Sequence, residues 1–420
     1  MIDICFVTTP IPELADDRLE APLGYLYMGS YLKGKGIQVQ IYDICSIPEE
    51  QWRFPEAKFY GFSTYSTTYH RTVAIKNKIK KQYPNAKFVA GGAHATALPK
   101  EVIKDFDFVV CGEGEILIYE IVTGHLPQGI YNPDNSKILD LDKLPFPDYD
   151  LVDVHSYRRV VAGKHSFSIL TSRGCPNSCA FCNSIIMGGR QRVRFRSPQN
   201  VIDEVISLKN KYGDIGIRFQ DDLFGSKREW LKEFTPLMKS LNMTYRAFVR
   251  ANQCCDKEFI DLLWQGGCRH ISLGIESGSD KILTRMMKGQ TVDHSRRGLK
   301  NAKEAGLITR IYLIVGFPGE TWETVQETID FIKEIKPDEF VVYPLIPYPG
   351  TPVWRDKEKY GLQNIDQDFT KYFQISFNNT GFVYDLDYAD RNELSMMKSK
   401  LESELIKAHS IWAIDSRGYA

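Results

Sequence analysis

The 420-residue sequence lacks the signatures of membrane, secreted and polyanion-binding proteins. No apolar run approaches the 18 or more residues that are typical of a membrane span. Lys plus Arg and Asp plus Glu both number 53, so no global positive field attracts nucleic acid, although a local patch would suffice. The first residues carry neither a basic region nor a small-residue cleavage site. We therefore expect a cytoplasmic protein with no membrane partner and no nucleic-acid partner.

The sequence also lacks a disulfide framework. Its nine cysteines are an odd number and are irregularly spaced, whereas small secreted domains pair their cysteines. Three of them, Cys175, Cys179 and Cys182, lie close together. Because a domain averages about 150 residues, the length predicts roughly two to three domains.

Residues 1–125 are expected to form a doubly wound, Rossmann-like α/β domain. Short β-branched runs alternate there with helical patterns, which is typical of a parallel sheet with helices on both faces. Ligands of such sheets bind at the carboxyl ends of the strands. The expected strands span residues 2–8, 38–42, 58–63, 87–90 and 106–111, the last being final, and the expected helices span 23–35 and 71–82.

The rest of the chain divides into a linker, a barrel and a cap. Residues 126–165 are rich in Pro, Asp and Asn, which indicates a linker. Residues 166–355 contain six βα repeats, two short of a full barrel. Residues 356–420 end in an amphipathic helix, 389–414, and form a helical cap. The expected barrel strands span residues 167–171, 215–220, 244–249, 270–274, 310–315 and 339–344, with helices at 198–212, 227–241 and 321–335.

The three clustered cysteines have the spacing C-x3-C-x2-C, just after the first barrel strand. Three thiolates can bind three irons of a 4Fe-4S cluster and leave the fourth iron open for another ligand. The alternative is a zinc site. A structural zinc site normally closes with a fourth Cys or His, however, and the nearest histidines, His165 and His270, are unsuitably placed.

This segment resembles the signature C-x3-C-x-aromatic-C of the radical S-adenosylmethionine (SAM) superfamily, with Phe181 as the aromatic residue. The resemblance implies a partial (β/α)6 barrel in which the amino and carboxylate groups of SAM chelate the open iron. One electron then cleaves SAM to a 5′-deoxyadenosyl radical. An external one-electron reductant, of the flavodoxin or ferredoxin type, is implied as a partner.

Motifs after the later barrel strands match the family's SAM-binding positions. Gln220 and Asp221 follow the second strand, where the family meets the SAM amino group, and Arg250 follows the third, where it suits the SAM carboxylate. Glu276 ends the fourth strand, where a carboxylate accepts from ribose hydroxyls. Taken singly, Arg250 and Glu276 also suit a salt bridge, and Asp221 a helix N-cap. The other implied SAM-binding residues are Phe181, Ser277, Gly316, Phe317, Tyr343 and Leu345.

The first domain resembles the cobalamin-binding domain that precedes the radical SAM barrel in some enzymes. Glycine-rich segments follow its expected strands, and glycines let the backbone approach a bulky corrin. The alternative is a flavodoxin-like domain that binds nothing, because fold does not fix function. The implied cobalamin-binding residues are Leu23, Gly24, Tyr25, Ser63, Thr64, Tyr65, Gly91, Gly92, His94, Ala95, Gly112, Glu113 and Gly114.

One motif departs from related cobalamin proteins. Many cobalamin-dependent mutases and methionine synthases carry D-x-H-x-x-G, whose His binds cobalt from below. Here Asp43 is followed by Cys45 at the His position and Pro48 at the Gly position. We therefore expect no protein histidine below cobalt and a displaced dimethylbenzimidazole tail, held in a crevice near His94 and Gly112.

The two resemblances together imply a cobalamin-dependent radical SAM methyltransferase that acts on a small molecule or a peptide. Such enzymes pass a methyl group from one SAM through methylcobalamin to an unactivated carbon, which a radical from a second SAM activates. One alternative is a non-methylating rearrangement, cyclisation or oxidation. Another is a methylthiotransferase whose second iron-sulfur cluster is held by Cys5, Cys45 and Cys111. A catalytically silent cobalamin or SAM sensor is a third. The sequence assigns no catalytic residue on the substrate side.

Overall fold

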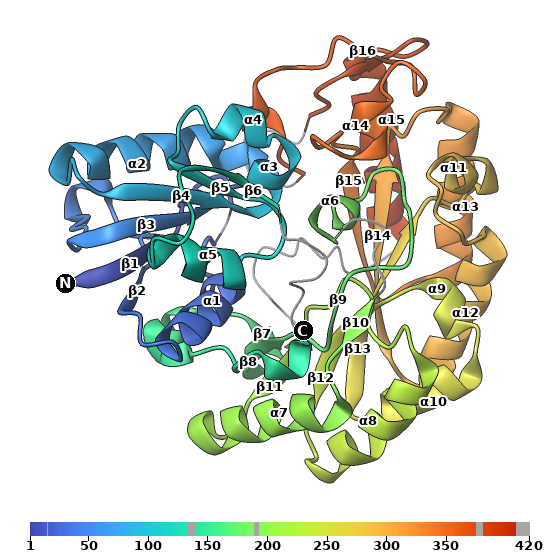
Figure 1. The fold of residues 1–420 in the computed structure, drawn as a ribbon. Coiled ribbons are helices and arrows are strands. Elements are labelled where there is room, and N and C mark those ends of the chain that lie inside the picture. Colours follow the sequence, from blue (N-terminus) through green and yellow to red (C-terminus); the bar gives the residue numbers. More distant parts are fainter. Residues whose placement is uncertain (15, 133–139, 189–192, 375–380, 409–420) are drawn as a thin grey trace.

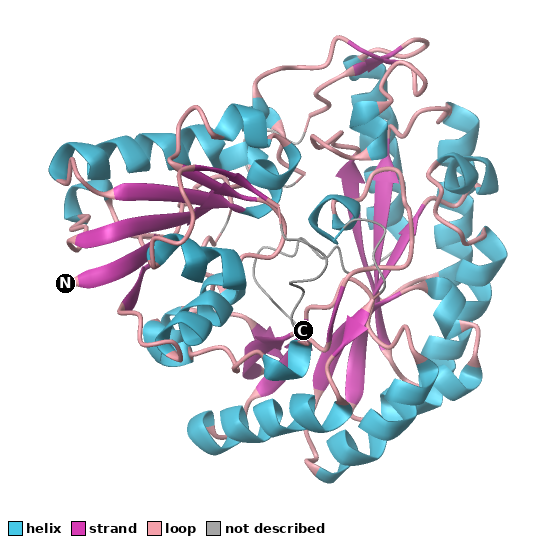
Figure 2. Cartoon of the chain, viewed as in Figure 1, coloured by secondary structure: helices cyan, strands magenta, loops and turns pink. Residues whose placement is uncertain are grey.

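The computed structural model describes residues 1–420 except 15, 133–139, 189–192, 375–380 and 409–420. It contains two large sheets, one of six strands and one of seven. Figure 1 shows the first sheet on the left of the view and the second on the right. Figure 2 shows helices on both faces of the first sheet and along the outer side of the second. The predicted α/β architecture, a Rossmann-like domain followed by a partial barrel, is confirmed.

The first sheet is parallel throughout, with the order β2-β1-β3-β4-β5-β6. Leu26 of helix α1 (Leu23–Lys33) and Ile118 of α5 (Glu115–Val122) pack on one face, whereas Ile75 and Ile79 of α2 (Tyr69–Gln82) pack on the other. Helices on both faces make the sheet doubly wound. The strands are β1 (Ile2–Val7), β2 (Val39–Tyr42), β3 (Ala57–Ser63), β4 (Lys87–Gly91), β5 (Phe108–Val110) and β6 (Gly129–Tyr131); the short helices are α3 (Gly92–Ala97) and α4 (Pro99–Val102).

One expectation about this sheet was wrong. The strand at residues 106–111 was expected to be the last, but β6 follows it and pairs with β5 in parallel. β6 has only three residues, of which Ile130 is exposed. So short and partly exposed a strand leaves no alternating apolar pattern in the sequence.

The second sheet has the order β15-β14-β13-β12-β11-β8-β7 and is parallel except for β7, which runs antiparallel to β8. The six parallel strands are the predicted barrel strands. They are β8 (Lys164–Ile169), β11 (Gly216–Phe219), β12 (Tyr245–Val249), β13 (Cys268–Glu276), β14 (Ile308–Val315) and β15 (Glu339–Pro344). The seventh strand of this sheet is β7 (Val160–Val161). Strands β9 (Ser172–Arg173) and β10 (Arg194–Phe195) pair with each other in a separate two-stranded sheet.

Helices between these strands bury apolar residues against the barrel. In α8 (Arg228–Ser240), for example, Trp230, Leu231 and Phe234 are buried. The main core of the molecule joins such side chains to those of the parallel strands. The other helices are α6 (Ser184–Gly188), α7 (Pro198–Tyr212), α9 (Ala251–Cys254), α10 (Lys257–Gln265), α11 (Asp280–Arg285), α12 (Val292–Glu304) and α13 (Trp322–Ile335).

The segment after the barrel covers its last strands and also reaches the first domain. Helix α15 (Arg391–Ala408) contacts α13, β14 and β15 and buries Leu394 and Leu401; the part of its predicted range at 409–414 lies outside the described residues. The Phe369 ring lies 5.6 Å from that of His94 in α3. The other elements are α14 (Pro352–Arg355), β16 (Leu362–Gln363) and β17 (Asp385–Leu386).

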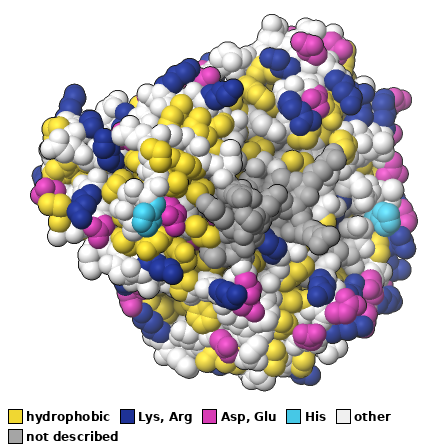
Figure 3. All heavy atoms as spheres, in the orientation of Figure 1, with side chains coloured by type: hydrophobic (Ala, Val, Ile, Leu, Met, Phe, Trp, Pro, Cys, Tyr) yellow, Lys and Arg dark blue, Asp and Glu magenta, His cyan; other side chains and the backbone are white. Residues whose placement is uncertain are grey.

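The visible surface carries both signs of charge. Figure 3 shows Lys and Arg side chains interspersed with Asp and Glu over the face in view, in keeping with their equal numbers. Within the described part of the chain, no helix combines the length and the apolar character that crossing a membrane requires.

Candidate functional site

A cavity of about 350 Å³ lies where the two domains meet. The first domain contributes loops from the carboxyl ends of its parallel strands, where ligands of such sheets bind. The barrel contributes the end of β8 and the start of the cysteine loop. Lining residues predicted for cobalamin are Leu23, Gly24, Tyr25, Ser63, Gly91, Gly92, Gly112, Glu113 and Gly114. Lining residues from the barrel side are Leu170, Ser172, Arg173, Gly174, Met187, Gln220 and Asp222.

Two glycines of the cavity wall require backbone conformations that other residues rarely adopt. Gly92 has a φ of +88°, and a Cβ atom there would lie 2.8 Å from Ser63 Oγ and 2.9 Å from Thr64 N. Gly112 has a φ of +72°. A side chain at position 92 would therefore force two loops of the wall apart. These glycines keep the wall close to whatever fills the cavity.

Four residues predicted for cobalamin do not line this cavity. Thr64 and Ala95 lie behind its wall, where Thr64 Oγ1 donates to Gly91 O (2.8 Å) and accepts from Ala95 N (3.0 Å). Tyr65 is 53% exposed. The buried His94 ring lies 4.4 Å from that of Tyr69, and burial lowers the pKa of His94 to about 4, so it is neutral at pH 7. Through its two hydrogen bonds, Thr64, which directly follows β3, is linked to the end of β4 and to α3.

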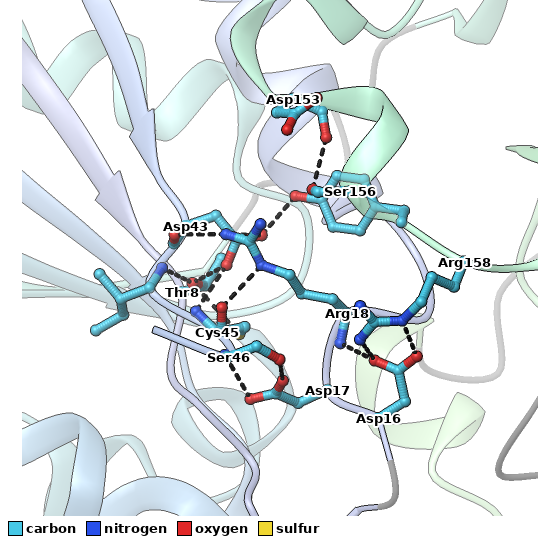
Figure 4. Close-up of polar contacts among 12 residues, drawn as sticks. Thr8, Asp16, Asp17, Arg18, Asp43, Cys45, Ser46, Asp153, Ser156 and Arg158 are labelled. Atoms are coloured by element: carbon cyan, nitrogen blue, oxygen red, sulfur yellow. Dashed lines mark hydrogen bonds and ion pairs between the residues drawn. The ribbon is translucent and has the colours of Figure 1, made fainter. Parts of the chain in front are cut away.

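The segment that replaces the D-x-H-x-x-G motif forms a closed polar network, shown in Figure 4. Asp43 Oδ1 accepts from Thr8 Oγ1 (2.6 Å) and from Cys45 N (3.0 Å), and Arg18 Nε donates to Cys45 O (2.8 Å). The Cys45 thiol is buried beside Thr8, and burial raises its pKa. Neither Cys45 nor any histidine is among the described residues that line the cavity. In this arrangement, Cys45 does not reach the cavity to serve as a lower ligand of cobalt.

The three clustered cysteines lie in the loop after β9. Asn177 Nδ2 donates to Cys175 Sγ (3.4 Å), and Cys182 Sγ donates to Ser184 Oγ (3.4 Å). The loop is anchored by Ala180 N, which donates to Met286 O (2.9 Å). Among the described residues, no three His, Cys, Asp or Glu side chains converge on one metal ion. In a 4Fe-4S cluster each thiolate binds a different iron, so the three thiols need not converge on one metal ion.

Arg250 places a buried guanidinium group beside this loop, and one of its three nitrogens has no partner among the described residues. Its side chain is buried, and its Nη1 donates to Cys179 Sγ (3.5 Å). A further nitrogen donates to Lys288 O, while Nε is buried with no partner among the described residues. A buried donor without a partner is costly unless a ligand satisfies it. An anionic group bound next to the cluster loop, as predicted for the SAM carboxylate, fits this geometry.

Glu276, the predicted ribose-binding residue, sits at a strained bend at the end of β13. Its φ is +69°, and the pairing of β13 with β14 shifts register between Gly274 and Glu276. Lys288 Nζ donates to Glu276 Oε1 (2.7 Å), and both side chains are buried. The Lys288 ammonium also lies 5.7 Å from the centre of the Phe181 ring. Such strain persists only where the surroundings impose it, which is common at functional sites.

The two predicted residues after β11 have different surroundings. The Asp221 carboxylate accepts from Thr171 Oγ1 (2.8 Å) and Ser172 Oγ (2.6 Å), and burial raises its pKa to about 6. It thus ties β11 to the segment that leads into the cysteine loop. Gln220 lines the cavity and donates to Glu20 of the first domain.

The other predicted SAM-binding residues lie near the ends of the last barrel strands. Gly316 has a φ of +85°, and a Cβ atom there would lie 2.3 Å from the Phe382 ring, so the segment after the barrel packs directly on this turn. Next to it, burial raises the pKa of Glu320 to about 8. Tyr343 stacks on Tyr312, with ring centres 5.9 Å apart. Phe317, Leu345 and Ser277 are buried.

Comparison with known proteins identifies both domains. The radical SAM superfamily model matches residues 169–332, and the B12-binding domain model matches residues 19–122. An uncharacterized methyltransferase of Pyrococcus horikoshii is 30% identical over 387 residues, which cover 84% of this chain and 82% of that protein. This chain belongs to the cobalamin-dependent radical SAM methyltransferases. The family's cofactors are a 4Fe-4S cluster, SAM and cobalamin.

One further relative and one solved structure also resemble this chain. The cytidylyl-2-hydroxyethylphosphonate methyltransferase of Streptomyces wedmorensis is 25% identical over 72% of this chain and 66% of its own. The solved structure of the radical SAM methyltransferase TsrM from Kitasatospora setae, with cobalamin and a 4Fe-4S cluster bound, shares the fold. It has a TM-score of 0.70 at 18% identity and covers 97% of this chain and 89% of its own.

Several cavity residues of this methyltransferase were missed by sequence reasoning. Tyr27 and Met28 of α1 reach the cavity one helical turn beyond the predicted Gly24, so helical spacing was a signal for them. Arg173 was not singled out, although it directly precedes the cysteine loop. The three cysteines considered for a second cluster, Cys5, Cys45 and Cys111, are all buried: Cys5 lies within β1 and Cys111 directly follows β5.

Proposed function

We propose that this chain methylates an unactivated carbon of a small molecule or a peptide. The observation that carries the proposal is one cavity bounded by the glycine loops of the B12-binding domain and by Gly174, the residue before the first clustered cysteine. When bound, the cofactors supply the methyl group and the radical, and the protein's task is to position them and to exclude water. A shared cavity meets that task because it brings both cofactors to one enclosed space.

The proposal includes the cluster and SAM sites, which the geometry of the cysteine loop and its neighbours supports. Cys175, Cys179 and Cys182 would bind three irons of the cluster, which leaves one iron for SAM. The buried Arg250 would bind the SAM carboxylate through Nε, the atom without a described partner. Glu276 would accept from the ribose hydroxyls while Lys288 fixes its carboxylate. Residues 1–125 and 166–355 would thus each hold one of the two cofactor systems.

The cobalamin site follows from the other wall of the cavity. Gly91, Gly92, Gly112 and Gly114 would let the backbone approach the cofactor, and Tyr25 would cover it with an apolar surface. The absence of histidine among the described lining residues supports a cobalt with no protein nitrogen below it.

A reducing environment and an electron donor are part of the proposal. None of the nine cysteines, all of which are described, forms a disulfide, which suits the cytoplasm. An external flavodoxin or ferredoxin would supply the electron that cleaves SAM.

Anaerobic product analysis tests the function. Cluster- and cobalamin-loaded protein is incubated with SAM carrying a CD3 methyl group, a reductant and a panel of candidate substrates. Methyl transfer through a radical predicts equal amounts of S-adenosylhomocysteine and 5′-deoxyadenosine and a product heavier by the labelled methyl group. Deoxyadenosine without S-adenosylhomocysteine would instead indicate a non-methylating reaction. Neither product with any substrate would favour a sensor.

A further inference from the structure

An ionic bridge joins the two walls of the cavity. Arg173 ends β9 and is followed directly by Gly174 and Cys175. Its Nη1 lies 3.2 Å from Glu113 Oε2, and its Nη2 donates to Glu115 Oε1 (2.6 Å). The two carboxylates flank Gly114 in the predicted cobalamin loop. One side chain of the barrel thus binds two side chains of the first domain in the wall of the cavity.

The bridge is held on several sides. The side chain of Glu115 is 8% exposed and that of Arg173 is 17% exposed, so water screens their attraction little. The Arg173 guanidinium lies 5.5 Å from the centre of the Tyr27 ring. Arg194, which pairs with Arg173 across β9 and β10, forms a second ion pair with Glu113. Burial raises the pKa of Glu115, but the positive charge of Arg173 outweighs this effect. The pKa of Glu115 therefore lies below its usual value.

The surroundings of this bridge differ from those of an ordinary surface salt bridge. Arg173, Gly174, Glu113 and Glu115 all line the cavity. A guanidinium that binds two carboxylates with separate nitrogens fixes their relative position, which a flexible ammonium does not do. Since Gly174 has a φ of +97°, the chain turns sharply between Arg173 and the first cysteine. Arg173, which binds the first domain, therefore directly precedes the turn into the cysteine loop.

We propose that Arg173 is a positioning residue that sets the distance between cobalamin and the 4Fe-4S cluster. By binding Glu113 and Glu115 it fixes the loop at residues 112–115 against the start of the loop at residues 174–182. This inference rests on the proposed function only in assigning one loop to each cofactor. A methyl group and a radical formed on different cofactors must reach the same carbon, so a variable separation would uncouple the two reactions.

Pulsed electron paramagnetic resonance measures this distance without any turnover. The full-length chain is loaded with both cofactors and reduced until the cluster and cob(II)alamin are both paramagnetic. We expect one narrow distance distribution in the unmodified protein and a broader or displaced one in Arg173→Met. Glu115→Gln, which keeps the size of the side chain, is expected to give a smaller change. Arg158→Met is the matched control, because Arg158 pairs with Asp16 of the first domain outside the cavity.

The outcomes separate positioning from general stabilisation. An unchanged distribution in Arg173→Met with full iron and cobalamin content would overturn the proposal, as would an equal broadening in Arg158→Met. If Arg173→Met does not retain cobalamin, the same measurement on Arg173→Lys decides, because Lys keeps the charge and loses the two-pronged geometry. With substrate, Arg173→Met is also expected to raise the ratio of deoxyadenosine to methylated product. A chain that holds both cofactors but never forms S-adenosylhomocysteine would refute the proposed function without affecting this distance.

Discussion

The buried pair of Glu276 and Lys288 permits a test that separates ligand binding from stability. Their charged atoms lie 2.7 Å apart, and the two side chains are 8% and 7% exposed. If Glu276 only forms a salt bridge, its loss affects folding alone. If it also accepts from the SAM ribose, its loss also weakens SAM binding.

The expected magnitudes of the two effects differ. Glu276→Gln leaves a buried ammonium without its counter-charge, which costs about 3–5 kcal/mol of stability. Loss of a charge-assisted hydrogen bond to SAM costs about 1–3 kcal/mol, or roughly a 5- to 150-fold increase in the SAM dissociation constant. The double variant Glu276→Gln/Lys288→Met contains neither charge. Its stability is expected to return toward that of the unmodified protein, because removing both partners of a buried pair is often neutral.

Two measurements on the same samples distinguish a Glu276 that only forms a salt bridge from one that also contacts SAM. Denaturant unfolding gives the free energy of unfolding, and equilibrium dialysis of cluster-loaded protein gives the SAM dissociation constant. Glu258→Gln is the control, since Glu258 pairs with Lys232 at 2.9 Å but both are about half exposed; its effect on stability should be at most about 1 kcal/mol. We expect the double variant to regain stability and to keep weak SAM binding. A double variant that binds SAM as tightly as the unmodified protein would refute the ribose contact.

Three further predictions concern the cluster, the cobalt and the barrel. Replacing Cys175, Cys179 and Cys182 with Ala should abolish iron binding and SAM cleavage while cobalamin stays bound; a full iron complement would contradict the assignment. The cob(II)alamin spectrum should show no triplet splitting from an axial nitrogen, because no histidine is among the described cavity residues; clear triplets would defeat this prediction. Burial raises the pKa of Glu320 from 4.5 to about 8, so the folded protein binds a proton there that the unfolded chain releases, and stability should fall as pH rises from 4.5 to 8. Glu320→Gln should flatten that profile in urea unfolding, and an equally steep profile would exclude Glu320 as the cause.

Part of the candidate site was predictable because it depends on strand order alone. In a parallel sheet, the segments after the strands meet at one edge, whatever their side chains do. Gly91, Gly92 and Gly112 therefore line one cavity, as the sequence predicted. Most of the six barrel strands were predictable for a different reason, because they are largely buried apolar runs; β14, for example, buries six of its eight residues.

The unpredicted part depends on contacts between distant segments. Asp221 was expected at the SAM amino group or as a helix N-cap. Its carboxylate accepts from the hydroxyls of Thr171 and Ser172, and nothing in the sequence indicated these contacts. The His94 ring contacts those of Tyr69 and Phe369, and neither contact was visible in the sequence. Periodicity describes one element at a time, so it does not reveal such partners.

The most direct test of the account is methyl transfer to cobalamin in the absence of substrate. The chain is loaded with its cluster and with reduced cobalamin and then mixed anaerobically with SAM that carries a CD3 methyl group. We predict one S-adenosylhomocysteine for each CD3 group recovered in the cobalamin fraction by mass spectrometry. Unlabelled cobalamin and intact SAM, with both cofactors bound in full amounts, would contradict the claim that this cavity brings the two cofactors together for methyl transfer.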